Sequence, residues 1–352
     1  MALFEPLVLR GLTLRNRIAV SPMCEYSAVD GLPDAWHMVH LGSRAVGGAG
    51  LVFTEATAVE ARGRISPVDT GIWNDAQAAA WAPIAEFIEA QGAVPGIQLA
   101  HAGRKASTEP PWAKGHRVEP ADGGWMTVAP SALAYSPDYP HPSALEAAGI
   151  DAIVEAFRNS TRRAVDCGFR VIEIHAAHGY LLHQFLSPLS NRRSDAWGGS
   201  FENRIRLTRS VVAAAREVMP ERLPLVVRIS ATDWIDGGWD LEQSIELSRL
   251  LKAGGVDLID VSSGGLAPGQ QISPGPGYQV PFAARIRREA DVATGAVGLI
   301  TEPDQAESII AAGEADIVLL ARELLRDPYW PRRAARELGA EIAVPRQYAR
   351  AW

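Results

Sequence analysis

The chain has 352 residues, of which 47% are hydrophobic and 21% charged, an ordinary composition for a folded enzyme. Its net charge of −7 disfavours a general nucleic-acid binder, and the spacing of Cys24 and Cys167 suggests neither a disulfide framework nor a structural zinc. No uncharged apolar run is long enough to span a membrane and the first residues lack a signal-peptide pattern, so we expect a cytoplasmic protein.

Strand-like and helix-like segments alternate along the whole chain. We expect strands at residues 18–23, 51–56, 94–100, 169–175, 224–230, 258–263, 296–300 and 317–321. Helices are expected at residues 36–46, 76–91, 150–166, 201–218, 241–253, 281–289, 302–312 and within 329–338. Eight strands that are each followed by a helix predict an α/β protein with a closed, single-domain (β/α)8 TIM barrel, and an open doubly wound sheet is the alternative.

The connection after the third strand, residues 101–145, is unusually long and rich in proline. Connections of this length are usually functional or disordered. Because this one begins at the carboxyl end of a barrel strand, where barrel enzymes carry their sites, we expect it to form a lid or subdomain over the site.

Two histidines and a tyrosine directly follow the apolar strand that begins at Val171. Imidazoles and a phenol at the carboxyl end of a strand can donate hydrogen bonds to a ligand carbonyl and then supply a proton. The segment therefore predicts a site at His175, His178 and Tyr180. The alternative is that both histidines are satisfied by the local backbone.

Cations and an amide occupy other strand ends, where few carboxylates occur, which disfavours a glycosidase. Arg228 lies inside an apolar strand and needs an anionic or carbonyl partner such as a flavin ring, to which the Gln98 amide could also bind. Arg322 follows the last strand and suits the phosphate site common in barrels, although an ion pair with Glu323 or Asp327 is the alternative. No glycine-rich dinucleotide or phosphate-loop fingerprint is present.

Several motifs in the same order resemble the Old Yellow Enzyme family, in particular its bacterial enoate and xenobiotic reductases, over essentially the whole length. These motifs lie at residues 14–18, 21–24, 96–105, 172–180, 185–191, 198–204 and 321–328. The resemblance implies a (β/α)8 barrel that holds FMN non-covalently and is reduced by NADPH or NADH. It also implies an ene-reductase, in which flavin N5 gives hydride to the β-carbon of an α,β-unsaturated carbonyl or nitro compound and the α-carbon is protonated.

The resemblance also implies residue roles. His175 and His178 match the pair that binds the substrate oxygen, and Tyr180 matches the proton donor. Cys24 matches a cysteine that modulates the flavin potential, and Tyr26 matches a substrate-pocket tyrosine. The matching flavin-binding residues are Ser21, Pro22, Met23, Cys24, Ala56, Gln98, Arg228, Gly298, Ala321 and Arg322. Here Arg322 matches the phosphate ligand, and Ala321 replaces a glycine of the relatives.

The C-terminal tail, residues 345–352, resembles a segment that crosses the dimer interface in the same subgroup. Arg350 matches the arginine that enters the neighbouring pocket and binds substrate, so a homodimer or homotetramer is expected, and burial is expected for the terminal Trp352. The alternative is a frayed tail.

Two other functions stay open for this sequence. One is a metal-dependent hydrolase that would use His101, His175 and His178 as ligands. The other is a barrel that binds small molecules without turnover. The leading function takes small activated alkenes as its partners and needs neither a nucleic acid nor a membrane.

Overall fold

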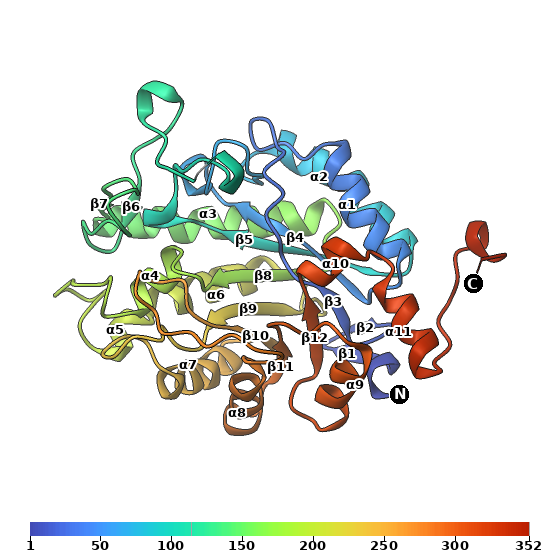
Figure 1. Cartoon of the computed structure of the whole chain (residues 1–352). Coiled ribbons are helices and arrows are strands. Elements are labelled where there is room, and N and C mark those ends of the chain that lie inside the picture. Colours follow the sequence, from blue (N-terminus) through green and yellow to red (C-terminus); the bar gives the residue numbers. More distant parts are fainter. Residues whose placement is uncertain (114, 352) are drawn as a thin grey trace.

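Eight parallel strands close into a barrel in the order β10-β11-β12-β3-β4-β5-β8-β9 (Figure 1). The computed structural model describes residues 1–113 and 115–351. The barrel strands are β3 (Ile18–Val20), β4 (Leu51–Ala58), β5 (Val94–Ala100), β8 (Val171–Ala176), β9 (Leu225–Ser230), β10 (Leu258–Ser262), β11 (Ala293–Ala296) and β12 (Ile317–Leu320). The expected single-domain (β/α)8 barrel is confirmed, and the open doubly wound sheet is wrong.

Helices surround the barrel, as Figure 1 shows. They are α1 (Ala35–Val46), α2 (Asp75–Ala90), α3 (Ala147–Asp166), α4 (Leu181–Leu186), α5 (Phe201–Arg204), α6 (Arg206–Val218), α7 (Leu241–Ala253), α8 (Val280–Ala290), α9 (Pro303–Ala311), α10 (Arg322–Arg326) and α11 (Trp330–Leu338). Both α1 and α2 begin at capping boxes, in which the Asp34 and Asn74 side chains accept backbone hydrogen bonds from the first helical turn.

The strands are buried on both faces because helices cover the outside and side chains fill the inside. This explains why they are nearly continuous apolar runs in the sequence. A short antiparallel hairpin of β1 (Leu7–Leu9) and β2 (Leu12–Leu14) contributes to a cluster with side chains at the amino ends of the strands, such as Leu51, Val94 and Val171. The sequence interpretation missed this hairpin, which closes the end of the barrel opposite the expected site.

The seventh strand differs from its prediction. It was expected at residues 296–300, but β11 spans Ala293–Ala296. Its residues are small, and Gly295 gives space to Leu319, because a Cβ there would lie 2.4 Å from the Leu319 side chain. The strand ends before Gly298, whose φ of 120° is incompatible with a β-ladder. The predicted helix at 201–218 is also divided, into α5 and α6.

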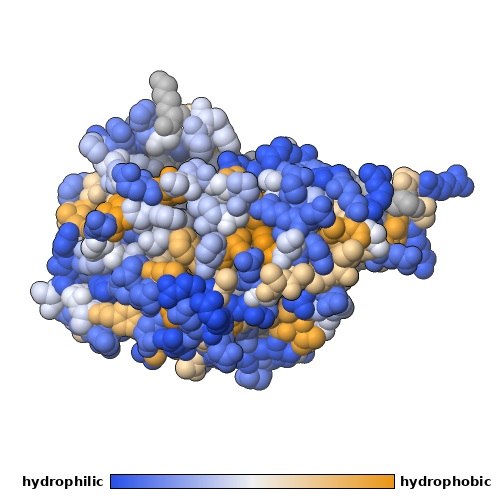
Figure 2. Space-filling view, turned by 60° about the horizontal axis from the view of Figure 1, so that its bottom comes forward, coloured by the Kyte–Doolittle hydropathy of each residue, from blue (hydrophilic) through white to orange (hydrophobic). Residues whose placement is uncertain are grey.

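The insertion at residues 101–145 rises from the carboxyl end of β5 and contains short strands β6 (Val128–Ala129) and β7 (Ser143–Ala144) (Figure 1). The last segment, which includes the 3-10 turn η6 (Arg346–Tyr348), projects away from the barrel in the same view. Figure 2 shows a largely hydrophilic face on which hydrophobic residues form small groups. None of the helices in residues 1–113 and 115–351 is long and apolar enough to cross a membrane.

Candidate active site

The carboxyl end of β8 brings together the three residues predicted from the sequence to form the centre of the site. The His175 and His178 ring centroids lie 5.1 Å apart, and the His175 and Tyr180 centroids lie 4.9 Å apart, both in edge-to-face arrangement. His175 is buried at the end of the strand, opposite Arg228 on β9. A single ligand could therefore contact both imidazoles and the phenol.

His178 has a left-handed backbone conformation with a φ of 57°, which is strained for a residue with a side chain. Two contacts hold it in place. Its N–H donates to Ser230 Oγ at 2.9 Å, and its carbonyl accepts from Lys105 Nζ at 2.9 Å. Because Lys105 Nζ also donates to the Gly265 carbonyl at 3.0 Å, it joins the turn after β8 to the loop after β10.

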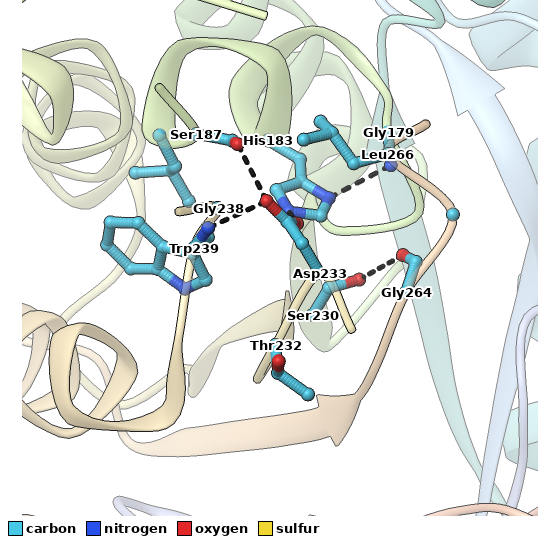
Figure 3. A network of polar contacts seen from close by, with 12 residues as sticks. Gly179, His183, Ser187, Ser230, Thr232, Asp233, Gly238, Trp239, Gly264 and Leu266 are labelled. Atoms are coloured by element: carbon cyan, nitrogen blue, oxygen red, sulfur yellow. Dashed lines mark hydrogen bonds and ion pairs between the residues drawn. The ribbon is translucent and has the colours of Figure 1, made fainter. Parts of the chain in front are cut away.

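A buried histidine–aspartate pair supports the same turn (Figure 3). The Gly179 N–H donates to His183 Nδ1 at 2.9 Å, and His183 Nε2 lies 2.9 Å from Asp233 Oδ1. Asp233 Oδ2 accepts from Ser187 Oγ at 2.6 Å and from the Trp239 N–H at 2.7 Å. Burial opposes ionisation of Asp233, but the interaction with His183 and the hydrogen bonds from Ser187 and Trp239 outweigh it and lower the pKa of this carboxyl.

The sequence interpretation missed His183, Asp233 and Lys105. One signal was present for His183, because it is one of only two polar residues in the fully buried helix Leu181–Leu186, and such residues need polar partners. Asp233 could not be paired with it from the sequence, since the two lie 50 positions apart. Lys105 is the last residue of the motif at 96–105, and nothing in that motif indicated a role for it.

A cavity of 450 Å³ opens beside Tyr180. Tyr26 and Lys105 line it together with residues of the insertion, namely Thr108, Glu109, Pro111, Gly115, His116, Asp138 and Tyr139. The Lys105 ammonium lies 5.4 Å from the centre of the Tyr180 ring, and burial and the nearby Arg104 lower its pKa to about 8. The insertion thus forms a wall of the cavity at whose edge Tyr180 lies.

The protonation states of the residues at the carboxyl end of β8 suit hydrogen-bond donation. Burial, followed by the charge of Arg228, lowers the pKa of both His175 and His178, so these imidazoles are neutral at pH 7. Burial raises the pKa of Tyr180, which keeps its phenol protonated. Burial and the nearby Asp69 likewise raise the pKa of Cys24, which makes it a thiol and not an activated nucleophile.

Three residues that the resemblance assigns to the flavin site are buried at the barrel strands, namely Gln98 on β5, Arg228 on β9 and Ser21 directly after β3. Gln98 Nε2 donates to Glu173 Oε1 at 2.6 Å, which leaves the amide oxygen as an acceptor. Arg228 Nη2 donates to Ser21 Oγ at 3.2 Å, and Arg228 Nε lies 3.1 Å from Asp260 Oδ2 in a buried ion pair. The remaining N–H groups of this guanidinium and the free amide oxygen of Gln98 fit a ring that carries both carbonyl and N–H groups. Ala56 pairs with Gln98 in the adjacent strand.

A second cavity, of 210 Å³, lies where β11 and β12 end, and Gly298, Ala321 and Arg322 line it. Within residues 1–113 and 115–351 no ion pair joins Arg322 to Glu323 or Asp327; Glu323 instead pairs with Arg326 and Arg333. The guanidinium thus fits an anionic group such as the FMN phosphate. Ala321, with a φ of −106° and a ψ of −99°, directly precedes α10.

The remaining expected residues lie on several other parts of the chain. Pro22 and Met23 follow β3 directly, and Met23 packs on the main core. Arg350 lies in the exposed last segment, away from its own barrel, and Trp352 lies outside the described residues. His101 Nε2 lies 2.8 Å from Glu60 Oε1, and no group of three or more His, Cys, Asp or Glu residues that could hold a metal occurs in the described part of the chain.

Comparisons with known proteins agree with this geometry. A model of the NADH:flavin oxidoreductase / NADH oxidase family matches residues 2–341. An NADPH dehydrogenase of Geobacillus sp. (strain WCH70) is 50% identical over 352 residues, which cover 99% of this chain and 98% of that protein. An NADPH dehydrogenase of Listeria monocytogenes serotype 4b (strain CLIP80459) is 48% identical, with 99% of each chain covered. Morphinone reductase, solved in complex with tetrahydroNAD, superposes with a TM-score of 0.80 at 29% identity, over 98% of this chain and 93% of that one.

Proposed function

We infer the function from one premise: the chain belongs to the NADH:flavin oxidoreductase / NADH oxidase family and is an FMN-dependent NADPH dehydrogenase of the Old Yellow Enzyme type. On this premise we propose that it is an ene-reductase. Its substrates are small α,β-unsaturated carbonyl and nitro compounds, whose C=C bond it reduces. The hydrolase is not supported, because His101 is paired with Glu60, and a barrel without turnover does not agree with the family.

The observation that carries this proposal is the neutral imidazole pair of His175 and His178 beside the protonated Tyr180. Two N–H donors aimed at one oxygen stabilise the negative charge that develops on a carbonyl or nitro group when hydride adds to the conjugated β-carbon. Tyr180 then supplies the proton to the α-carbon as a general acid. Burial of His175 strengthens these hydrogen bonds because little water competes.

Bound FMN supplies the hydride in this reaction. Gln98 and Arg228 would hold the edge of its ring that carries carbonyl and N–H groups, and Ser21 and Asp260 fix Arg228 in position. Arg322 would bind the phosphate beside Gly298 and Ala321. The other contacts to the ring would come from Pro22, Met23, Cys24 and Ala56.

Cys24 and Tyr26 act at the edge of the same site. A neutral Cys24 thiol beside the ring would modulate its potential without attacking it, because burial raises the pKa of the thiol. Tyr26 contributes to the wall of the cavity, and residues 101–145 act as a lid that excludes water from the substrate. The nicotinamide reductant is an intracellular metabolite, so we expect the reaction in the cytoplasm.

The last segment completes the site of a second copy in this proposal. Residues 345–351 extend from the barrel, and Arg350 is exposed. We expect a homodimer or homotetramer in which Arg350 enters the neighbouring cavity. Mixing Arg350→Ala subunits with subunits inactivated by Tyr180→Phe tests this. Restored alkene reduction relative to either variant alone is expected if the arginine acts across the interface, and activity no higher than the mean of the two contradicts it.

Anaerobic half-reactions test the function. The purified protein should be yellow, NADPH should bleach the flavin absorbance, and cyclohexenone should restore it in a second step. Saturated cyclohexanone is the matched control and should restore nothing. If reduced enzyme is reoxidised by cyclohexenone no faster than by buffer, the ene-reductase proposal is wrong even though the protein binds FMN.

A further inference from the structure

A neutral imidazole donates a hydrogen bond from only one of its two nitrogens. His175 and His178 are both neutral at pH 7, because burial and Arg228 lower their pKa values. Two imidazoles can therefore stabilise one oxygen only if each carries its proton on the nitrogen that faces the ligand. The tautomer of each ring, and not its charge, then decides whether the pair works.

The tautomer of His175 follows from its own strand end. Its Nδ1 lies 3.2 Å from the backbone N–H of Ala177, which can only donate. Nδ1 must therefore be the unprotonated nitrogen, and Nε2 carries the proton. Because this partner is a backbone group, no side-chain substitution at residue 177 other than proline would remove it.

His178 has a different partner, the hydroxyl of Ser262 at the carboxyl end of β10. Its Nε2 lies 2.7 Å from Ser262 Oγ, and a hydroxyl can either donate to this nitrogen or accept from it. The other acceptor within reach of Ser262 Oγ is Gln279 Oε1, at 3.4 Å. The direction of the hydroxyl decides which nitrogen of His178 is protonated.

Gln279 is already committed to other partners. Its Nε2 donates to the Val297 carbonyl at 2.9 Å, which fixes the orientation of the amide, and its Oε1 accepts from Ser263 Oγ at 2.6 Å. For the hydroxyl proton of Ser262, His178 Nε2 is therefore a nearer acceptor than Gln279 Oε1, which already accepts from Ser263. In the described residues, His178 Nδ1 makes no hydrogen bond to the protein.

We propose that Ser262 is a positioning residue that donates to His178 Nε2 and so keeps the proton of His178 on Nδ1, where it faces the ligand. His175 Nε2–H and His178 Nδ1–H then form a matched pair of donors. This assignment rests on the proposed function in one respect only: the ligand oxygen is taken to be the carbonyl or nitro oxygen of an activated alkene.

The backbone around His178 supports this assignment. The Ser230 Oγ and Lys105 Nζ contacts fix both of its peptide groups, so the ring keeps Nε2 directed at Ser262. The Ser230 hydroxyl donates a hydrogen bond to the Gly264 carbonyl at 2.8 Å, so its oxygen is the acceptor for the His178 N–H. The last residue of β10 thus contacts the ring of His178, and Gly265 in the loop that follows lies against its main chain.

Nitrogen-15 NMR of the oxidised holoenzyme labelled at histidine tests the tautomer directly, at neutral pH and without turnover. Comparison with His178→Asn assigns the His178 signals. We expect protonated Nδ1 and an acceptor Nε2 in the wild type and in Ser262→Thr, which retains a hydroxyl. In Ser262→Ala we expect a mixture in which Nε2 is partly protonated. A wild-type spectrum with protonated Nε2 overturns the proposal.

Binding of 4-hydroxybenzaldehyde, followed by the change in flavin absorbance, gives the second readout. Ser262→Ala should weaken it about tenfold, the order of one hydrogen bond to a charged group. Ser262→Thr should restore it. Ser248→Ala is the matched control, because it also removes a buried hydroxyl, which donates to the Ser244 carbonyl within α7, away from the histidines. Equal affinity in Ser262→Ala and Ser248→Ala contradicts the proposal.

The two proposals fail in distinguishable ways. If alkenes are not reduced but His178 carries its proton on Nδ1, the ene-reductase proposal fails alone. If alkenes are reduced while His178 Nε2 is protonated in the wild type, the assignment of Ser262 fails alone.

Discussion

The turn after β8 and the C-terminal segment both carry a residue expected at the substrate, yet their support differs. His178 and Gly179 are held by contacts from Ser230, Lys105 and His183, which lie on separate elements. Residues 345–351 are mostly exposed, and beyond short-range backbone hydrogen bonds the Tyr348 ring lies 6.4 Å from the Tyr329 ring. The first region is held by several elements of its own barrel, whereas the second rests on few contacts with it.

This contrast explains how a strained backbone is maintained at the site. A left-handed residue persists only where its surroundings leave it no alternative. The turn packs tightly against the loop after β10 at Gly179, where a Cβ would lie 2.2 Å from the Gly265 carbonyl oxygen. The close approach of the two loops keeps the His178 ring next to Ser262. Substitutions in this turn should therefore affect chemistry, and those in the tail should affect assembly.

The largest expected effect comes from Tyr180→Phe, which removes the hydroxyl proposed as the proton donor and keeps the aromatic ring. We expect the alkene half-reaction to slow by about 10³-fold, within the range for general acid catalysis, while reduction of the flavin by NADPH is unchanged. Anaerobic stopped-flow measurement of both half-reactions checks this. Equal slowing of both would show that Tyr180 is not a dedicated donor.

Removing an imidazole should have the next largest effect. We expect His175→Ala and His178→Ala each to weaken binding of 4-hydroxybenzaldehyde by about 10²-fold, the cost of one donor to a charged oxygen in a buried site. FMN should stay bound, because its proposed ligands lie elsewhere. Spectrophotometric titration gives the affinity and filtration gives the bound flavin. Wild-type affinity in both variants would refute the role of the pair.

Asp233→Asn tests whether the turn depends on its buried support. The change weakens the acceptor for Ser187, Trp239 and His183, so we expect unfolding to require about 2 kcal/mol less free energy. Hydrogen exchange at the Gly179 amide should accelerate. The control is Asp195→Asn, which alters a half-exposed ion pair with Arg193 and should have little effect. Equal loss in both variants would contradict a special role for Asp233.

Lys105 should add a smaller, pH-dependent effect. Burial and Arg104 lower its pKa to about 8, so its positive charge is present below that pH and is lost as the pH rises through it. Binding of pentafluorophenol, which is ionised at neutral pH and above, should therefore weaken several-fold between about pH 7 and about pH 9.

Two variants sharpen this test. Lys105→Met should bind pentafluorophenolate weakly at every pH, and Lys105→Arg should bind it without the decline, because a guanidinium stays charged. A wild-type profile that does not change around pH 8 would show that Lys105 contributes only through its hydrogen bonds to the His178 and Gly265 carbonyls.

The smallest effect on stability is expected in the tail. Arg350→Ala should change the free energy of unfolding by less than about 0.5 kcal/mol, because the residue is exposed. It should nevertheless raise KM for the alkene if the residue enters a neighbouring cavity. Chemical denaturation and steady-state kinetics check both statements, and an unchanged KM would leave the tail without the proposed role.

Much of the fold could be predicted from the sequence, because hydrophobic residues recur with the spacing of helices or form the continuous apolar runs of buried strands. The expected bounds of β5 and α7 coincide with the observed ones. β11 was misplaced because Ala-Thr-Gly-Ala carries little strand signal, and the apolar residues after it form a loop. The hairpin of β1 and β2 was missed because its strands have three residues each.

The centre of the site was predictable because His175, His178 and Tyr180 lie together in one motif. Their supports were not. Asp233 meets His183 across 50 positions and Ser262 meets His178 across 84, so neither contact leaves a pattern in the sequence. The role of Ser262 depends on where Gln279 directs its amide, which only the folded structure defines.

The most direct test of the account is the position of the transferred hydrogen. NADPH deuterated at both C4 positions should be incubated with cyclohexenone and the holoenzyme in ordinary water, and the product analysed by NMR. We predict cyclohexanone that carries reductant-derived deuterium at the β-carbon and a solvent-derived proton at the α-carbon. Deuterium on the carbinol carbon of an allylic alcohol would contradict the account, because the enzyme would then reduce the carbonyl and not the alkene.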